Sequence, residues 1–303
     1  MSDSYDVAVI GEGVSGLTAA QKLAQGGARV ATFEAQLFGG LVVNVNELEP
    51  SPAEDGVSGA EYAAGLMQVN AELGVESIQE PVTAIRAVSG GFEVVTAETT
   101  RKARHIVVAS GARLKRLGVP GEEEYEGRGV SQCADCDGPM YQGETAVVVG
   151  GGDSALQEAL VLAQYCDQLY LVHRRDTYRA RADLVEQIDS NPKITRIFNA
   201  TVAAISGTEM VQAVTLRHAD GREEPLSCAG VFAYIGLVPS ADMVPAEVQR
   251  DPAGCVKTND ELETAVRGLW AIGAVRSGYG GTLNDAIGEA ERVAQSVKKR
   301  LAG

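Results

Sequence analysis

The feature that most constrains this chain is a pattern that occurs twice: a short β-branched strand, a glycine-rich turn, a helix and a second strand. The two turns read Gly11-Glu12-Gly13-Val14-Ser15-Gly16 and Gly150-Gly151-Gly152-Asp153-Ser154-Ala155. In such turns the first glycine permits the tight bend, the third residue lets a pyrophosphate approach the backbone, and the last small residue lets the helix pack closely. The helix N-terminus that follows favours the charge of a phosphate. The repeat therefore predicts an α/β fold with two Rossmann-like dinucleotide-binding domains.

The second strand of the first copy ends at an acidic residue. This strand covers residues 29–33, and Glu34 follows it directly. An acid about 20 residues after the glycine turn hydrogen-bonds the ribose of an adenosine. A further glycine turn, Phe38-Gly39-Gly40-Leu41, comes next. With both strands and Glu34 in place, the pattern indicates a dinucleotide site and not an ordinary glycine turn.

The second copy ends in basic residues instead. Its second strand, residues 169–172, leads into His173-Arg174-Arg175-Asp176, and Arg179 follows closely. Arginine at this place binds a 2′-phosphate, so the pattern favours NADP over NAD. The alternative is a solvated basic turn without a ligand.

Two cysteines stand close together in the segment Cys133-Ala134-Asp135-Cys136-Asp137. Cysteines at this spacing close a small disulfide, and one of the two thiols often has a lowered pKa. A thiolate attacks a disulfide or a flavin ring, and Asp137 is placed to pass the proton that the exchange needs. The alternatives are half of a zinc site, or two small buried residues with Asp137 as a helix cap. Zinc needs four ligands and the other cysteines and histidines stand alone, so redox chemistry is favoured and no metal is expected.

Composition limits the class of protein and its partners. A chain of 303 residues is better explained by two domains than by one. The net charge of −15 argues against nucleic acids and anionic membranes as partners. No apolar run is long enough to span a bilayer, and the acidic N-terminus leads straight into a strand, so we expect no signal peptide. Five cysteines, an odd number and mostly isolated, suit a reducing cytoplasm.

The remaining pattern fills in the two domains. Residues 62–73 have the spacing of an amphipathic helix, residues 115–126 are rich in Gly, Pro and Glu, and residues 236–240 have the composition of a return linker. We therefore expect domain boundaries near residues 115 and 240. Further helices are expected at 17–23, at 156–166 and from 284 onward. Further strands are expected at 6–10, 82–86, 92–96, 105–109, 146–149, 197–205, 211–216, 230–233 and 268–273.

Together these motifs resemble those of low-molecular-weight bacterial thioredoxin reductases over nearly the whole chain. The resemblance is carried by the two glycine turns, the cysteine pair, the basic run, Ser110-Gly111-Ala112 and Gly127-Arg128-Gly129-Val130-Ser131. It implies FAD bound in the first unit, NADPH bound in the second, and a homodimer. It also implies a discontinuous FAD-binding domain, 1–115 and 241–303, with the NADPH-binding domain, 116–240, inserted into it and able to swivel.

The resemblance also implies roles for individual residues. By position, Cys136 corresponds to the thiol that faces the flavin, Cys133 to the thiol that attacks the partner disulfide, and Asp137 to the acid. The flavin nucleotide is expected at Gly11, Gly13, Gly16, Glu34, Gly39, Gly40, Ala112 and Gly273. The nicotinamide nucleotide is expected at Gly150, Gly152, Asp153, Ser154, Ala155, His173, Arg174, Arg175 and Arg179.

The chain departs from this family in loops that hold or flank the flavin. Leu41 stands where the family has Gln, and Pro50 aligns with its Asn. The family's Arg-Gln-Ala near the C-terminus becomes Gly280-Gly281-Thr282. These differences bear on how the flavin is held and on its redox potential.

A further departure removes a carboxylate. The family's Gly-Asp-Val near the C-terminus is Gly273-Ala274-Val275 here. In the family this Asp accepts a hydrogen bond from a ribityl hydroxyl of the flavin, and a methyl group accepts none. The next segment offers Asn284 or Asp285 as a replacement acceptor.

The sequence therefore predicts an NADPH-dependent flavoprotein disulfide reductase similar to thioredoxin reductase. Electrons are expected to pass from NADPH to FAD, then to the Cys133–Cys136 disulfide, then to thioredoxin or a similar dithiol protein. Among enzymes, the alternatives are a dithiol oxidase or a reductase of a small-molecule disulfide. The alternative outside enzymes is a flavin-bound redox sensor with little turnover. The altered flavin loops favour a sensor, whereas the intact cysteine pair and arginine cluster argue against it.

Overall fold

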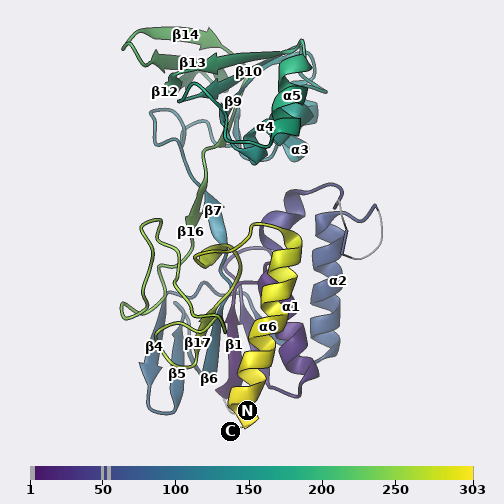
Figure 1. Ribbon diagram of the computed structural model, residues 1–303, viewed down its shortest axis with the longest axis vertical. Coiled ribbons are helices and arrows are strands. Elements are labelled where there is room, and N and C mark those ends of the chain that lie inside the picture. The colour runs from purple at the N-terminus through teal and green to yellow at the C-terminus, as the bar shows by residue number, and fades with distance from the viewer. Residues whose placement is uncertain (1–3, 49–50, 53–55, 303) are drawn as a thin grey trace. The chain divides into compact units, whose positions relative to one another are not determined.

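The computed structural model describes residues 4–48, 51–52 and 56–302, so Pro50 lies outside the described residues. The chain divides into two compact units (Figure 1). Unit 1 consists of Met1–Arg113 and Val238–Gly303, and unit 2 of Leu114–Leu237. Each unit has its own central sheet and its own hydrophobic core. Unit 1 is thus built from two separate stretches of the chain.

Unit 1 is organised around a seven-stranded sheet. Its strands are β1 (Ser4–Ile10), β2 (Val30–Phe33), β3 (Glu76–Ile78), β4 (Ala84–Val88), β5 (Gly91–Val95), β6 (Thr100–Val108) and β17 (Leu269–Ala271). The order is β3-β2-β1-β6-β5-β4, and β17 also pairs with β6. The pairs among β3, β2, β1, β6 and β17 are parallel, whereas β4 and β5 form an antiparallel extension. The antiparallel strands predicted at 82–86 and 92–96 are confirmed as β4 and β5.

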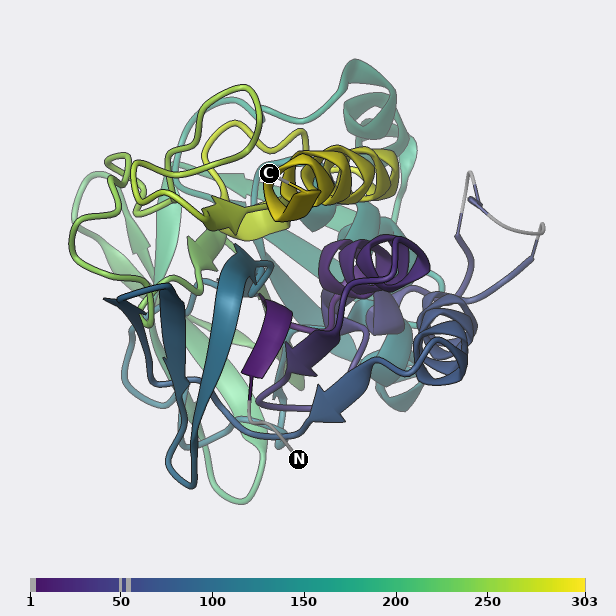
Figure 2. The ribbon, with the colours of Figure 1, turned by 90° about the horizontal axis from the view of Figure 1, so that it is seen from below.

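Three helices lie on the same side of these parallel strands (Figure 2). They are α1 (Val14–Gln25), α2 (Gly59–Glu72) and α6 (Leu283–Ala302). Side chains alternate across a strand, and β1 is buried on both faces. Val7 and Val9 pack with residues of α1 and α6, whereas Ala8 and Ile10 belong to the core on the opposite face. Burial of both faces explains the continuous apolar run that marks this strand in the sequence.

Unit 2 contains a parallel sheet and a separate antiparallel one. The five parallel strands are β8 (Val130–Ser131), β9 (Thr145–Gly150), β10 (Gln168–His173), β11 (Ile194–Phe198) and β15 (Gly230–Tyr234). The antiparallel strands are β12 (Ala200–Gly207), β13 (Val211–His218) and β14 (Glu223–Ser227). The helices are α3 (Ala134–Asp137), α4 (Asp153–Leu162) and α5 (Ala182–Ser190). The parallel order is β11-β10-β9-β15-β8, so the predicted α/β fold is confirmed.

The chain passes between the units through two short strands, β7 (Ala112–Leu114) and β16 (Leu237–Pro239), which pair with one another. On the unit 2 side, the Lys115 N–H donates to the Gly236 carbonyl at 2.9 Å. On the unit 1 side, the Ser240 N–H donates to the Gly111 carbonyl at 3.0 Å. These strands have no signal in the sequence beyond the linker composition.

The strand predicted over 197–205 is wrong, because the chain forms two strands there. Asn199 has a φ of +55°, and this left-handed residue ends β11 and allows β12 to begin a different sheet. Helix α5 was also missed. The helix buries only Leu184 and Ile188. Two apolar residues on one face give a weak helical pattern in the sequence.

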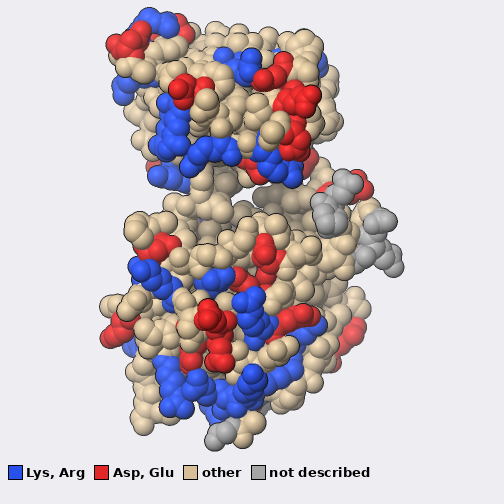
Figure 3. All heavy atoms as spheres, viewed as in Figure 1, with Lys and Arg blue, Asp and Glu red and all other residues tan. Residues whose placement is uncertain are grey.

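No helix of the described ranges combines the length and apolar character needed to cross a bilayer. On the face seen in Figure 3, acidic and basic side chains are interspersed over each unit. The net charge of −15 is therefore not gathered into one acidic patch on that face.

Candidate active site

The first glycine turn joins β1 to α1 at the carboxyl end of the parallel strands, where α/β sheets bind ligands. Gly11 has a φ of +106°, and a Cβ there would lie 2.4 Å from the carbonyl oxygen of Ala109. A Cβ on Gly16 would lie 2.0 Å from the carbonyl oxygen of Gly11. The protein's own packing therefore requires glycine at both positions.

Gly13 differs, because neither its backbone nor its neighbours require a glycine. Its φ of −71° and ψ of 175° suit any residue, and the atom closest to an added Cβ would be the Gly39 carbonyl oxygen at 3.9 Å. The open space lies at the N-terminus of α1, which no side chain caps. A pyrophosphate that approaches the backbone there would accept hydrogen bonds from the helix N–H groups. The turn thus fits the pyrophosphate of FAD.

Glu34 stands beside this turn at the end of β2. Its carboxylate accepts hydrogen bonds from the backbone N–H groups of Glu12, Ala35 and Gln36 at 2.8, 2.9 and 3.0 Å. These bonds fix the side chain against the glycine turn. A carboxylate has about four acceptor sites, so one remains for a ribose hydroxyl.

The other residues expected at the flavin lie partly around the same turn. The Gly39 N–H donates to the Glu12 carbonyl at 2.7 Å, and an isolated parallel bridge joins Gly39 to the middle glycine of the first turn. Gly40 follows with a φ of +62°. A Cβ on Gly273 would lie 2.6 Å from a serine hydroxyl in the first turn of α1. Ala112 lies in β7, where the chain leaves the unit.

Glu12, which the sequence motifs did not mark as a site residue, is fully buried at the first turn. Its carboxylate accepts hydrogen bonds from the hydroxyls of Thr32 and Ser77 at 2.5 and 2.6 Å and from Gln79 Nε2 at 3.2 Å. Glu12 therefore joins the turn to β2 and to the β3 segment. The available signal was a charged residue between two glycines of a tight turn.

The second glycine turn repeats this plan between β9 and α4. A Cβ on Gly150 would lie 2.5 Å from the Cβ of Ala155, and one on Gly151 would lie 2.2 Å from the His173 ring. A Cβ on Gly152 would meet no atom within 4 Å. The φ of Gly152 is −106°, and no side chain caps α4. Gly152, like Gly13, thus leaves a place for a pyrophosphate, and the turn fits the nicotinamide nucleotide.

The loop that carries the arginines is hydrogen-bonded to this turn. The Arg179 N–H donates to the Gly151 carbonyl at 2.8 Å. The Arg181 N–H donates to Asp153 Oδ1 at 2.8 Å, and the Arg181 guanidinium lies 3.8 Å from the same carboxylate. Asp153 therefore anchors the arginine loop at the N-terminus of α4. Arg181 was not singled out in the sequence, although it stands two residues after Arg179.

The basic side chains of the loop differ in exposure. Three arginines of the loop are exposed, namely Arg174, Arg175 and Arg179. Among the described residues, no Asp or Glu forms an ion pair with these three side chains. The ion pairs in this region are formed by Arg181 and Arg196 instead. His173 is buried, and burial lowers the pKa of its ring. His173 is therefore neutral at pH 7 and its ring packs against the turn at Gly151, while the exposed arginines fit the predicted 2′-phosphate site.

Cys133 and Cys136 form a disulfide around the first turn of α3, with their Cα atoms 5.3 Å apart. The Cys136 N–H donates to Cys133 Sγ at 3.1 Å. Cys136 is exposed and Cys133 half-buried. Both sulfurs are used in the bond, and no metal-binding group of three or more His, Cys, Asp or Glu occurs in the described part of the chain. Asp137 is half-buried, and its side chain does not cap the short helix that follows.

The remaining cysteines lie in unreactive surroundings. Cys166 and Cys228 are buried, and burial raises the pKa of their thiols to about 11 and about 12. Burial also raises the pKa of Cys255. Since the thiolate is the reactive form, the raised pKa values make these three thiols poorer nucleophiles near neutral pH than an ordinary cysteine.

Two side chains that the sequence motifs did not mark contact the backbone between the cysteines. Glu158 Oε2 and the Tyr234 hydroxyl lie 3.1 and 3.2 Å from the Ala134 N–H, and 3.1 Å from one another. Burial raises the pKa of Glu158. The signal for Glu158 was its spacing, because it lies on the same face of α4 as the buried Ala155 and Leu162.

The loop that lacks the family carboxylate is held by another acid. Glu289, on α6, is buried and accepts hydrogen bonds from the Gly273 N–H at 2.8 Å and from Arg276 Nε at 3.0 Å. Asp285, a predicted replacement acceptor, accepts hydrogen bonds from the backbone N–H and hydroxyl of Thr282 at 3.0 and 2.6 Å. The Asp285 N–H donates in return to the Thr282 hydroxyl at 3.1 Å. Asp285 is therefore already used in a capping box at the start of α6.

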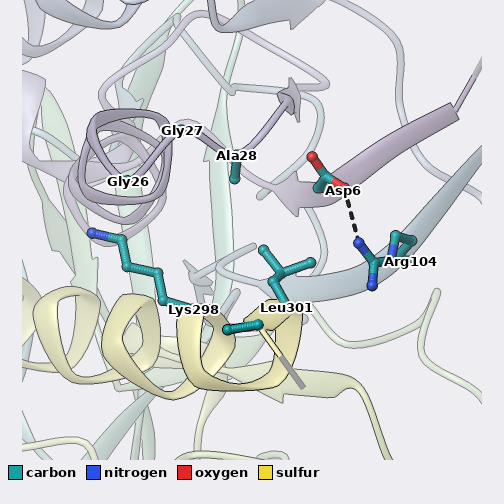
Figure 4. A pocket seen from close by; sticks show the side chains of 8 residues that line it. Asp6, Gly26, Gly27, Ala28, Arg104, Lys298 and Leu301 are labelled. Atoms are coloured by element: carbon teal, nitrogen blue, oxygen red, sulfur yellow. Dashed lines mark hydrogen bonds and ion pairs between the residues drawn. The ribbon is translucent and has the colours of Figure 1, made fainter.

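A pocket on unit 1 lies at the other end of the sheet (Figure 4). It is lined by Asp6 near the start of β1, residues 26–28 after α1, Arg104 and Lys298. Asp6 and Arg104 form an ion pair of 3.4 Å there. Nucleotides bind at the carboxyl ends of parallel strands, so this pocket is not a candidate cofactor site.

Comparison with known proteins gives a consistent result. Residues 5–293 match the family model of the pyridine nucleotide-disulphide oxidoreductases. The chain is 37% identical to the thioredoxin reductase of Treponema pallidum over 279 residues, which cover 91% of each protein. The crystal structure of Lactococcus lactis thioredoxin reductase matches with a TM-score of 0.92 at 32% identity, over 98% of this chain and 99% of that one. Thioredoxin reductase of T. acidophilum matches with a TM-score of 0.90 at 28% identity, over 100% of both chains.

These findings confirm the predicted resemblance and the predicted pair of dinucleotide-binding domains. They also confirm the predicted class of activity, a disulfide reductase that uses FAD and NADPH. The chain therefore belongs to the pyridine nucleotide-disulphide oxidoreductase family, as a thioredoxin reductase-like enzyme.

Proposed function

We propose that the chain uses NADPH to reduce the disulfide of thioredoxin or a thioredoxin-like protein through Cys133 and Cys136. The observation that carries this proposal is the Cys133–Cys136 disulfide itself, which lies around α3, with Cys136 exposed and Cys133 half-buried. The relatives at 37% and 36% identity are named thioredoxin reductases, which supports the same acceptor here. Bound FAD supplies the means to turn a hydride from NADPH into the electron pair that a disulfide needs.

The two cysteines have different proposed roles. The Cys133 thiolate attacks the disulfide of the partner, forms a mixed disulfide and releases one partner sulfur. Cys136 then attacks Cys133 Sγ, which closes the internal disulfide and releases the second partner sulfur. Asp137 passes the proton that this exchange needs. Two electrons thus leave the dithiol and reduce the partner.

The two glycine turns hold the two nucleotides in this proposal. Residues 1–115 and 241–303 form the FAD-binding domain, with the pyrophosphate against Gly13 and an adenosine ribose at Glu34. Residues 116–240 form the NADPH-binding domain, with the pyrophosphate against Gly152. Its exposed arginines bind the 2′-phosphate.

The surroundings of the enzyme are part of the same proposal. We expect a homodimer in the cytoplasm, as the resemblance implies, with no nucleic acid or membrane as partner. The net charge of −15 supports the exclusion of nucleic acid and of anionic membranes. The buried, unpaired Cys166 and Cys228 support a reducing compartment.

The test of the acceptor is capture of the partner as a mixed disulfide. Cys136→Ser keeps the attacking Cys133 and removes the thiol that resolves the mixed disulfide, so thioredoxin should remain bound until a reductant is added. The matched control is Cys133→Ser, which should capture nothing. A small-molecule adduct on Cys133, detected by mass spectrometry with no protein bound, would favour a reductase of small disulfides instead.

A further inference from the structure

We propose that Glu158 and Tyr234 are positioning residues for the redox disulfide, which hold the peptide N–H after Cys133 and place a negative charge beside the cysteine pair. This charge disfavours the thiolate and makes the reduced pair a stronger reductant. The inference rests on the proposed function, because it assumes that the Cys133–Cys136 disulfide is reduced and reoxidised.

The geometry ties the peptide between the cysteines to two rigid elements. Glu158 projects from α4, and Tyr234 is the last residue of β15. The Tyr234 hydroxyl has one proton and donates it to Glu158 Oε2 at 3.1 Å, so its oxygen is left to accept from the Ala134 N–H at 3.2 Å. Ala134 is fully buried. The side chains of Glu158 and Tyr234 therefore hold the backbone next to Cys133 in place.

The surroundings of the Glu158 carboxylate, as far as the structure describes them, add no positive charge. Among the described residues, no Lys or Arg forms an ion pair with it, and the charged neighbour that acts on it is Asp135, of the same sign. Burial is the largest effect and raises the pKa of Glu158, while the hydrogen bonds from Tyr234 and Ala134 lower it. The titratable groups that face the carboxylate are Asp135 from α3 and Tyr234 from β15. Burial raises the pKa of Tyr234, which stays protonated.

The redox step explains why this charge matters. Reduction breaks the Cys133–Cys136 bond, takes up two electrons that the enzyme draws from NADPH, and takes up one proton when one sulfur remains a thiolate. A carboxylate held close to the pair raises the free energy of that thiolate. A disulfide whose reduced form is stabilised is a strong oxidant, so a destabilised thiolate has the opposite effect and lowers the reduction potential. Glu158 therefore favours transfer of electrons to the partner.

The test is the redox equilibrium of the full-length, flavin-loaded chain with mixtures of reduced and oxidised dithiothreitol at several pH values. The fraction of Cys133–Cys136 dithiol is counted by alkylation and mass spectrometry. Glu158→Gln keeps an acceptor for the Ala134 N–H and removes the charge. Tyr234→Phe keeps the charge and removes the hydroxyl. The matched control is Glu186→Gln, which makes the same charge change at an exposed position of α5.

Glu158→Gln should shift the equilibrium toward the dithiol by roughly three- to tenfold at mildly alkaline pH, which is about 14–30 mV for this two-electron couple. The shift should vanish at acidic pH, where the wild-type carboxyl is protonated. In the wild type, the Glu158 carboxylate lowers the dithiol fraction once it is ionised. Tyr234→Phe should move the pH at which this lowering begins to a higher value, because the carboxylate loses a hydrogen-bond donor that stabilises its charge. Glu186→Gln should leave the equilibrium unchanged.

Two results would overturn the inference. If Glu158→Gln left the redox equilibrium unchanged, the carboxylate would have no effect on the disulfide. If Glu158→Gln shifted the equilibrium by the same amount at every pH, the side chain would act through packing and not through its charge. If Glu158→Gln fails to fold, Tyr234→Phe still decides, because an unchanged pH dependence there contradicts the proposed contact. A wild-type pair that does not equilibrate with dithiothreitol would instead contradict the proposed function.

Discussion

The two glycine turns share one backbone plan and differ in charge. In each, the glycine at the first position is packed against the chain's own atoms, whereas the glycine at the third position, Gly13 or Gly152, is not required by that packing. The first turn is flanked by the carboxylate of Glu34 at the end of β2. The second is flanked by Arg174 and Arg175, both exposed after β10.

The difference separates two parts of nucleotide recognition. The turn and the helix N-terminus bind a pyrophosphate, which FAD and NADPH have in common. The residue after the second strand meets the ribose, where an acid accepts from a hydroxyl and an arginine binds a 2′-phosphate. In the proposed function, one fold used twice therefore holds two nucleotides, and the charge after the second strand is what distinguishes the two sites.

The largest expected effect comes from a change that leaves both turns intact. Cys136→Ser should abolish multiple-turnover reduction of a protein disulfide, because the cysteine pair can no longer cycle. NADPH should still bleach the absorbance of the bound flavin, since neither nucleotide site is altered. The two signals are followed in parallel, by stopped-flow absorbance and by disulfide-dependent oxidation of NADPH. Loss of both would show that the turns do not work independently of the cysteine pair.

The next effect tests the basic side of the comparison. Charge-assisted hydrogen bonds contribute about 1.5–3 kcal/mol each, so Arg174→Ala with Arg175→Ala should raise the KM for NADPH by roughly tenfold or more. The KM for NADH should hardly change. Steady-state kinetics with both nucleotides measure this, and Arg217→Ala on the exposed face of β13 is the control. Equal losses with NADPH and NADH would mean that the arginines are structural.

A smaller effect is expected at the loop beside the first turn. Ala274→Asp should tighten FAD binding by roughly tenfold, because one hydrogen bond to a charged acceptor is worth at least about 1.5 kcal/mol. Asp285→Ala should leave FAD affinity unchanged and lower the free energy of unfolding by about 1 kcal/mol, because its carboxylate caps α6. Fluorescence quenching of FAD and thermal melts measure the two quantities. If Asp285→Ala lost the flavin and Ala274→Asp bound it no tighter, the acceptor would be Asp285.

The sequence predicted best the features that recur locally. Each of these features is encoded by a short stretch of the chain and depends on a residue type that few others can replace. They are the two turns, the strands around them and the cysteine pair. Gly11 is an example, because no Cβ fits there. The strand boundaries near Asn199 were missed because a left-handed non-glycine residue has no strong sequence signal.

The side chains that support the site were missed for a different reason. Glu158 and Tyr234 meet Ala134 although they lie 24 and 100 residues away in the chain. Glu289 reaches Gly273 from α6, at a separation of 16 residues. Contacts of this kind depend on the packing of whole elements. The spacing along α4 indicates that Glu158 faces the core, but it does not indicate which group the carboxylate meets there.

The most direct test of the account replaces one unneeded glycine in each turn and measures both nucleotides. In the flavin-free chain, Gly13→Ala and Gly152→Ala should each lower the melting temperature less than Gly150→Ala does, because an added Cβ would meet no protein atom closer than 3.9 Å in the first turn and none within 4 Å in the second. Gly13→Ala should weaken binding of FAD and spare that of 2′,5′-ADP, a probe of the NADPH site, and Gly152→Ala should do the reverse. Gly150→Ala is the control that should lower the melting temperature, because its Cβ would lie 2.5 Å from that of Ala155. If both folded variants lost the same nucleotide, or neither lost any, the assignment of one nucleotide to each turn would be contradicted.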